Sequence, residues 1–157
     1  MKQKLQDIMT QNVASVSPQQ TVAQAAQIMS QYNVGVVPVV QNGKPVGMLT
    51  DRDITLRVSS NGQDANTTQV QSVMSNGVMS GTTDMDVHEA SKLMAQNQIR
   101  RLPVTQNGQM AGIVSLGDLA VQNVYQNEAG QALTSISQPA KPQMQSGQQQ
   151  QQQPQMY

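Results

Sequence analysis

Two short motifs in the chain place a hydroxyl side chain three residues before a carboxylate. They are Thr50 with Asp53 and Ser115 with Asp118. A carboxylate can accept two hydrogen bonds from the vicinal hydroxyls of a ribose, and a hydroxyl beside the free N–H groups of a helix N-terminus suits a phosphate. The same spacing is also that of a helix cap with an acidic residue in the first turn. Both roles can coexist in one motif, so both are kept as hypotheses.

The four arginines are the side chains best suited to bind a phosphate, because a planar guanidinium can donate two parallel hydrogen bonds. Arg52 lies inside the first motif, and Arg57 follows about one helical turn later. Arg100 and Arg101 are adjacent in the sequence. We expect Arg52, Arg100 and Arg101 to contact a phosphate. The alternative is that Arg52 pairs with Asp51 and that the other arginines lie on the surface.

Both motifs belong to an internal repeat. Shifting the sequence by 65 residues aligns 5–58 with 70–123 without a gap, and 15 of the 54 aligned pairs are identical. The identities include glycines, prolines and apolar residues in register, which chance matching of the many glutamines does not explain. The sequence therefore predicts two copies of one structural unit, which bury their faces against each other because a unit of about 55 residues is marginally stable alone.

Each unit is predicted to run strand, helix, strand, strand, helix. The first strand is expected at Val13–Val16, and the apolar spacing from Val22 to Met29 is that of one helix face. Asn42-Gly43 is typical of a two-residue type I′ hairpin turn. A second helix is expected from Thr50, and its counterpart in the second unit is expected to carry Leu119, Ala120 and Val124.

The composition excludes several classes of protein. Only 11% of the residues are charged, Lys and Arg balance Asp and Glu, and cysteine, phenylalanine and tryptophan are absent. We therefore expect no disulfide, no metal site and no nucleic-acid partner. No apolar run is long enough to span a membrane, and the first residues lack the apolar core of a signal peptide, so we expect a cytoplasmic protein.

Both repeats resemble CBS domains, and the pair resembles a stand-alone tandem CBS module. The resemblance covers roughly residues 2–126. In the first repeat it depends on Ile8-Met9-Thr10, Val34-Gly35-Val36-Val37-Pro38-Val39 and Gly47-Met48-Leu49-Thr50-Asp51-Arg52-Asp53. In the second it depends on Val73-Met74-Ser75, Ile99-Arg100-Arg101-Leu102-Pro103-Val104 and Gly112-Ile113-Val114-Ser115-Leu116-Gly117-Asp118.

The resemblance implies an α+β fold of two β-α-β-β-α units related by a pseudo-twofold axis, with two clefts between them. We expect one CBS domain at 2–60, a polar linker at 61–69, a second CBS domain at 70–126, and a disordered Gln/Pro-rich tail at 127–157.

By the same resemblance, such modules usually bind AMP, ADP or ATP and sometimes S-adenosylmethionine, require no other cofactor, and commonly form homodimers. Aspartates at the positions of Asp53 and Asp118 hold the ribose. The adenine is expected near Val34, Val36, Ile99, Thr10 and Ser75, although ordinary core packing explains each apolar side chain as well. Without Phe or Trp, we expect aliphatic groups to hold the base. The second repeat has Arg100-Arg101 where the first has Gly35-Val36, so the two clefts are not expected to be equivalent.

The sequence therefore predicts a regulatory, non-catalytic module that binds an adenosine-containing ligand and transmits its occupancy to an unknown protein partner. The alternative is a dimerisation scaffold with empty clefts. An enzyme is disfavoured, because one histidine and no cysteine leave few groups for acid–base or nucleophilic chemistry.

Overall fold

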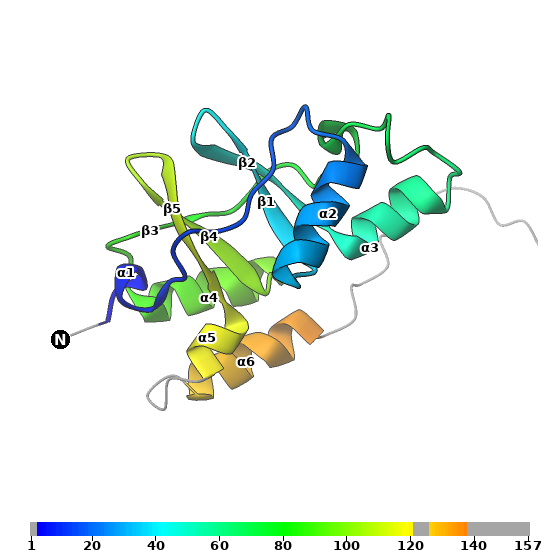
Figure 1. The fold of residues 1–157 in the computed structure, drawn as a ribbon. Helices are drawn as coiled ribbons and strands as arrows, with labels where there is room; N and C mark the ends of the chain where they lie inside the picture. Colours follow the sequence, from blue (N-terminus) through cyan, green and yellow to red (C-terminus); the bar gives the residue numbers. More distant parts are fainter. Residues whose placement is uncertain (1–2, 121–125, 138–157) are drawn as a thin grey trace, which may run out of the picture.

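The computed structural model describes residues 3–120 and 126–137 and contains two similar α+β units side by side (Figure 1). The first unit contains helix α2 (Val22–Tyr32), the hairpin of β1 (Val36–Gln41) and β2 (Lys44–Thr50), and a second helix. That second helix is α3 (Asp51–Ile54), continued by the π-helical segment η1 (Thr55–Ser59).

The second unit repeats this order 65 residues later. It contains β3 (Gly81–Thr82), α4 (Val87–Asn97), the hairpin of β4 (Arg101–Gln106) and β5 (Gln109–Ser115), and α5 (Leu116–Ala120). Two short helical segments, α1 (Leu5–Ile8) and the 3₁₀ turn η2 (Val70–Ser72), precede the units. Both hairpins are antiparallel, and each has a register shift at the equivalent place, Val39/Val40 and Val104/Thr105.

Local sequence signals account for the two hairpin turns and for the start of α2. Asn42 and Gly43 have φ of 51° and 77°, and Asn107 and Gly108 have φ of 52° and 78°, as a type I′ turn requires. Thr21 caps α2 by accepting the backbone N–H of Gln24.

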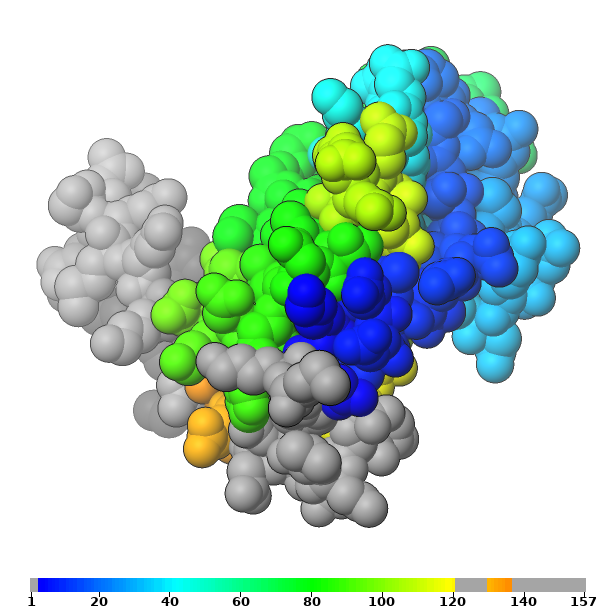
Figure 2. Space-filling model, turned by 90° about the vertical axis from the view of Figure 1, so that its left-hand side faces the viewer, coloured from blue at the N-terminus to red at the C-terminus, as the bar shows by residue number. Residues whose placement is uncertain are grey.

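The segments that precede the units are exchanged between them. Leu5 of α1 is fully buried in the core of the second unit, beside Val87 and Leu102. Val70 and Val73, around η2, are buried in the core of the first unit. In Figure 2 the dark-blue N-terminal residues lie against the green surface of the second unit. Each repeat therefore completes the core of the other, which explains why two copies are needed.

Each exchanged segment then crosses the hairpin of the other unit. Thr10 and Ile113 exchange two backbone hydrogen bonds of 2.9 and 3.0 Å, and Ser75 and Met48 do the same at 2.9 and 3.1 Å. A Cβ atom at Gly112 would lie 2.7 Å from the carbonyl oxygen of Thr10. Glycine is needed there because the two backbones approach so closely.

Two expectations from the sequence are wrong in part. Val13–Val16 forms no strand, and only Val16 makes an isolated parallel bridge to Val39. The tail was expected to be disordered from residue 127, but Gln126–Ser137 forms helix α6, which packs on α4 and α5 (Figure 1). The helix forms because Ala132 becomes buried by this packing. Val124 and residues 138–157 lie outside the described residues.

None of the helices in the described part of the chain is both long and apolar enough to cross a membrane.

Candidate functional site

Both hydroxyl–carboxylate motifs lie where the second strand of a hairpin turns into a helix. Thr50 donates its backbone N–H to Asp53 Oδ2 at 2.9 Å, and Asp53 N–H donates to Thr50 Oγ1 at 3.0 Å. Ser115 and Asp118 make the same pair of bonds at 2.7 and 3.1 Å. Both motifs are therefore reciprocal helix caps. The caps fix the position of each carboxylate, and each leaves the second oxygen, Oδ1, for another partner.

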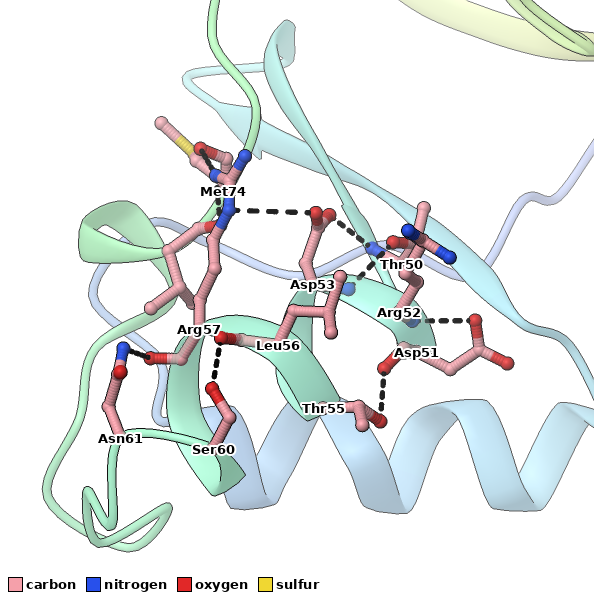
Figure 3. Close-up of polar contacts among 11 residues, drawn as sticks. Thr50, Asp51, Arg52, Asp53, Thr55, Leu56, Arg57, Ser60, Asn61 and Met74 are labelled. Atoms are coloured by element: carbon pink, nitrogen blue, oxygen red, sulfur yellow. Dashed lines mark hydrogen bonds and ion pairs between the residues drawn. The ribbon is translucent and has the colours of Figure 1, made fainter. Parts of the chain in front are cut away.

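The second carboxylate oxygen, Oδ1, has different interaction partners in the two repeats. Asp53 Oδ1 lies 3.9 Å from Nε of Arg57, one turn further along the helix (Figure 3). Arg57 also donates from Nη1 to the carbonyl oxygen of Val73 at 2.9 Å, so its guanidinium is held in place. Within the described residues, Oδ1 of Asp118 has no hydrogen bond or ion pair. The Oδ1 atom of Asp118 can therefore still accept a hydrogen bond, whereas the Oδ1 atom of Asp53 already pairs with Arg57.

Asp118 lines a cleft of about 290 Å³ built from both repeats, which we call the Asp118 cleft. The first repeat contributes Thr10, Asn12, Val13, Ala14, Tyr32, Val34, Val36 and Pro38, and the second contributes Arg101, Ile113, Ser115 and Asp118. The lining combines hydroxyls, one carboxylate, one guanidinium and an apolar wall. It includes six of the residues predicted from the sequence: Thr10, Val34, Val36, Arg101, Ser115 and Asp118.

A second cleft of about 350 Å³, the Ser75 cleft, is the pseudo-twofold counterpart of the first. All its lining residues except Asn76 stand 65 positions from a residue of the Asp118 cleft: Met48, Ser75, Gly77, Val78, Met79, Asn97, Ile99, Arg101 and Pro103. The predicted residues Ser75, Ile99 and Arg101 meet here. Thr50 and Asp53 are not among the residues that line this cleft.

The four arginines have separate positions. Arg101 lines both clefts, because it stands at the first residue of β4 between them. Arg100 instead lines a third cavity, together with Arg101 and Ser115. Arg52 lies on the exposed surface of α3, and its side chain points away from Arg57 in Figure 3. The bond between Arg52 and Asp51 is made by the backbone N–H of Arg52, at 2.8 Å, and not by its guanidinium.

Tyr32 is a site residue that the sequence analysis missed. It is the last residue of α2, is 56% exposed, and lines the Asp118 cleft together with Val34. The expectation that only aliphatic groups are available to a base is therefore wrong for this cleft. The signal was present in the sequence: Tyr32 is one of only three aromatic residues and lies two positions before an apolar residue of the predicted site.

A family model for the CBS domain matches residues 5–60 and 70–122 of the chain. The chain belongs to the CBS-domain family. The match falls on the two units described above, and α6 lies beyond it. CBS-domain proteins generally act as regulatory or sensor modules that bind adenosine-containing ligands.

The relatives of this CBS pair include stand-alone proteins of similar size. The CBS domain-containing protein YhcV of Bacillus subtilis is 52% identical over 133 residues, covering 85% of this chain and 94% of that protein. The crystal structure of a conserved CBS domain protein of unknown function, TA0289 from Thermoplasma acidophilum, has a TM-score of 0.73 and 26% identity, covering 86% of this chain and 76% of that one. The hexameric CBS-CP12 protein from bloom-forming cyanobacteria has a TM-score of 0.69 and 29% identity, covering 81% and 75% of the two chains.

Proposed function

We propose that this CBS pair is a non-catalytic regulatory module that binds an adenosine-containing ligand in the Asp118 cleft. The observation that supports the proposal is the lining of this one cleft, where a carboxylate, a guanidinium, three hydroxyl side chains and an apolar wall come together from both repeats. Such a mixture of apolar surface with a few polar groups is typical of small-molecule sites.

The ribose is assigned to Asp118. Its Oδ2 is fixed by the backbone N–H of Ser115 at 2.7 Å, which leaves Oδ1 to accept hydrogen bonds from a ribose diol. In the first repeat, the ion pair to Arg57 competes for the equivalent oxygen of Asp53. The Asp118 cleft is therefore the stronger of the two sites.

The remaining walls suit the rest of such a ligand. Val34, Val36 and Tyr32 offer an apolar and aromatic surface to an adenine ring, and the hydroxyls of Thr10 and Ser115 offer hydrogen bonds. Arg101 supplies a positive charge for a phosphate, and within the described residues it makes no ion pair. AMP, ADP and ATP share these groups, and S-adenosylmethionine shares the ribose and the base.

A ligand in this cleft contacts both repeats at once. Thr10 and Val34 belong to the first repeat, and Arg101 and Asp118 to the second. Binding therefore favours those relative positions of the two units that fit the ligand, and a partner protein or a second copy of the chain reads the change. The hexameric assembly of the CBS-CP12 protein supports an oligomeric form as the receiver of the signal.

Calorimetric titration with AMP, ADP, ATP and S-adenosylmethionine tests the proposal. We expect at least one of them to bind, and Asp118→Asn to weaken binding about 10- to 100-fold, because hydrogen bonds to a charged acceptor contribute about 1.5–3 kcal/mol. Asparagine retains an oxygen that caps Ser115, so the helix start is preserved.

Asp53→Asn is the matched control, since it makes the same change in the equivalent cap. We expect it to leave the affinity of the Asp118 cleft within twofold. Failure of all four compounds to bind, or equal losses in the two variants, would show that the assignment of the ribose to Asp118 is wrong.

A further inference from the structure

Helix α6 forms one wall of a cavity, to which it contributes Gly130 and Leu133. The helix lies beyond the residues matched by the CBS-domain model and packs on α4 and α5 (Figure 1). Ala132 is almost fully buried, and Gln98, just after α4, donates from Nε2 to the carbonyl oxygen of Ser135 at 3.0 Å. The cavity beneath the helix, which we call the α6 cavity, has a volume of about 580 Å³.

The lining of the α6 cavity is both cationic and apolar. Its described residues are Arg100, Arg101, Ser115, Leu116, Gly117, Ala120, Gly130 and Leu133. They include two guanidiniums and no carboxylate, and among the side chains that the structure describes, those of 3–120 and 130–136, neither arginine makes an ion pair. Two adjacent positive charges on one wall, without a compensating acid in that lining, attract an anion.

The α6 cavity and the Asp118 cleft share two wall residues, Arg101 and Ser115. The backbone of Arg100 is held next to the start of α5, because its carbonyl oxygen accepts a hydrogen bond from the N–H of Leu116 at 2.8 Å. The equivalent position in the first repeat is Gly35, so the Ser75 cleft has no counterpart of Arg100. Arg52 stands at the position equivalent to Gly117, so each repeat carries positive charge near its second helix, but only the second repeat has the adjacent pair Arg100 and Arg101.

We propose that the α6 cavity receives the phosphate chain of a ligand whose nucleoside lies in the Asp118 cleft, and that α6 forms the wall that covers this chain. The inference depends on the proposed function and extends it to a ligand class: a nucleoside di- or triphosphate is preferred over the monophosphate. Because binding and docking are coupled, an occupied cavity stabilises the docked position of α6. Helix α6 thereby reports the number of phosphates on the ligand.

Titration of the full chain with AMP, ATP and inorganic tripolyphosphate tests this inference. We expect ATP to bind at least about 10-fold more tightly than AMP, and tripolyphosphate to bind without any nucleoside. Arg100→Gln is expected to weaken ATP and tripolyphosphate about 10- to 100-fold while changing AMP by less than twofold. The matched control is Lys44→Gln, which removes one positive charge at the exposed start of β2 and is expected to change none of the three.

A tryptophan at position 133 gives an independent readout of α6. The chain contains no tryptophan, and Leu133 lines the cavity while remaining 46% exposed, so Leu133→Trp introduces a single fluorescent reporter. We expect ATP and tripolyphosphate, but not AMP, to shift its emission.

The outcomes separate the two proposals. If AMP binds in a manner that depends on Asp118, but ATP is no tighter and tripolyphosphate does not bind, the α6 cavity is not a phosphate site and the proposed function stands. If tripolyphosphate binds through Arg100 but no nucleotide binds better than tripolyphosphate, the cavity stands and the proposed function fails. If nothing binds, both are overturned.

Discussion

Replacing Arg57 with alanine tests whether this side chain holds the segment around Val73 against the core of the first repeat. Nη1 of Arg57 donates to the carbonyl oxygen of Val73 at 2.9 Å, and Nε lies 3.9 Å from Asp53 Oδ1. The guanidinium therefore links the helix after β2 to the residues that complete the core from the second repeat. Alanine removes both links, and we expect a lower free energy of unfolding.

The magnitude follows from the exposure of the groups. A hydrogen bond from a charged donor contributes about 1.5–3 kcal/mol, and the lower end applies because the Arg57 side chain is 51% exposed. An ion pair at such a site adds at most about 1 kcal/mol. We therefore expect Arg57→Ala to cost about 2 kcal/mol. For a chain of this size, this corresponds to a decrease in Tm of roughly 4–8 °C.

Urea unfolding followed by circular dichroism, together with calorimetric Tm values, measures the loss. Asp53→Asn removes only the ion pair and keeps an oxygen for the helix cap, so it should cost less than about 1 kcal/mol. Arg52→Ala, at an exposed position of the same helical segment, should change stability by less than about 0.5 kcal/mol. The reasoning is refuted if Arg57→Ala behaves like Arg52→Ala, or if Asp53→Asn costs as much as Arg57→Ala.

Two further predictions concern the crossing of the segments and an exposed carboxyl group. Gly112→Ala should destabilise the fold by about 1–3 kcal/mol in urea unfolding, because its Cβ would lie 2.7 Å from the carbonyl oxygen of Thr10. Gly117→Ala, whose Cβ meets no atom closer than 3.5 Å, is the control and should not destabilise. The hydroxyl of Thr82 donates to Asp84 Oδ1 at 2.7 Å and lowers the pKa of that carboxyl group. Its contribution to stability is thus present above the unfolded pKa and lost as the pH falls through the folded pKa. Thr82→Val should raise the pKa of Asp84 in an NMR titration, and an unchanged value would contradict this cause.

Local features of the fold could be predicted from the sequence because they depend on residues close together in the chain. The hairpin turns follow from Asn42-Gly43 and Asn107-Gly108, whose φ angles are positive as predicted. The caps of the helices follow from a hydroxyl and an acid three residues apart, a distance that a single turn spans. The strand expected at Val13–Val16 is wrong because a short extended segment becomes a strand only by pairing with a neighbour, and here only Val16 does so.

The candidate site could be predicted in part for the same reason. Thr10, Val34 and Asp118 belong to separate sequence motifs, and the structure brings them to one cleft. The sequence does not reveal that Arg57 pairs with Oδ1 of Asp53, while Oδ1 of Asp118 has no such partner among the described residues. The reason is that the position of Arg57 depends on its hydrogen bond to Val73, which precedes the second repeat's unit.

The sequence by itself determined that the chain contains two copies of one CBS unit, with their turns, caps and apolar faces, since these depend on local spacing. Only the tertiary structure decided which segment completes which core, that Arg101 serves both clefts, and that 126–137 forms a helix over Arg100. The physical reason is that these features depend on contacts between residues far apart in the chain. For such contacts, the burial of Leu5 or Ala132 outweighs any local preference.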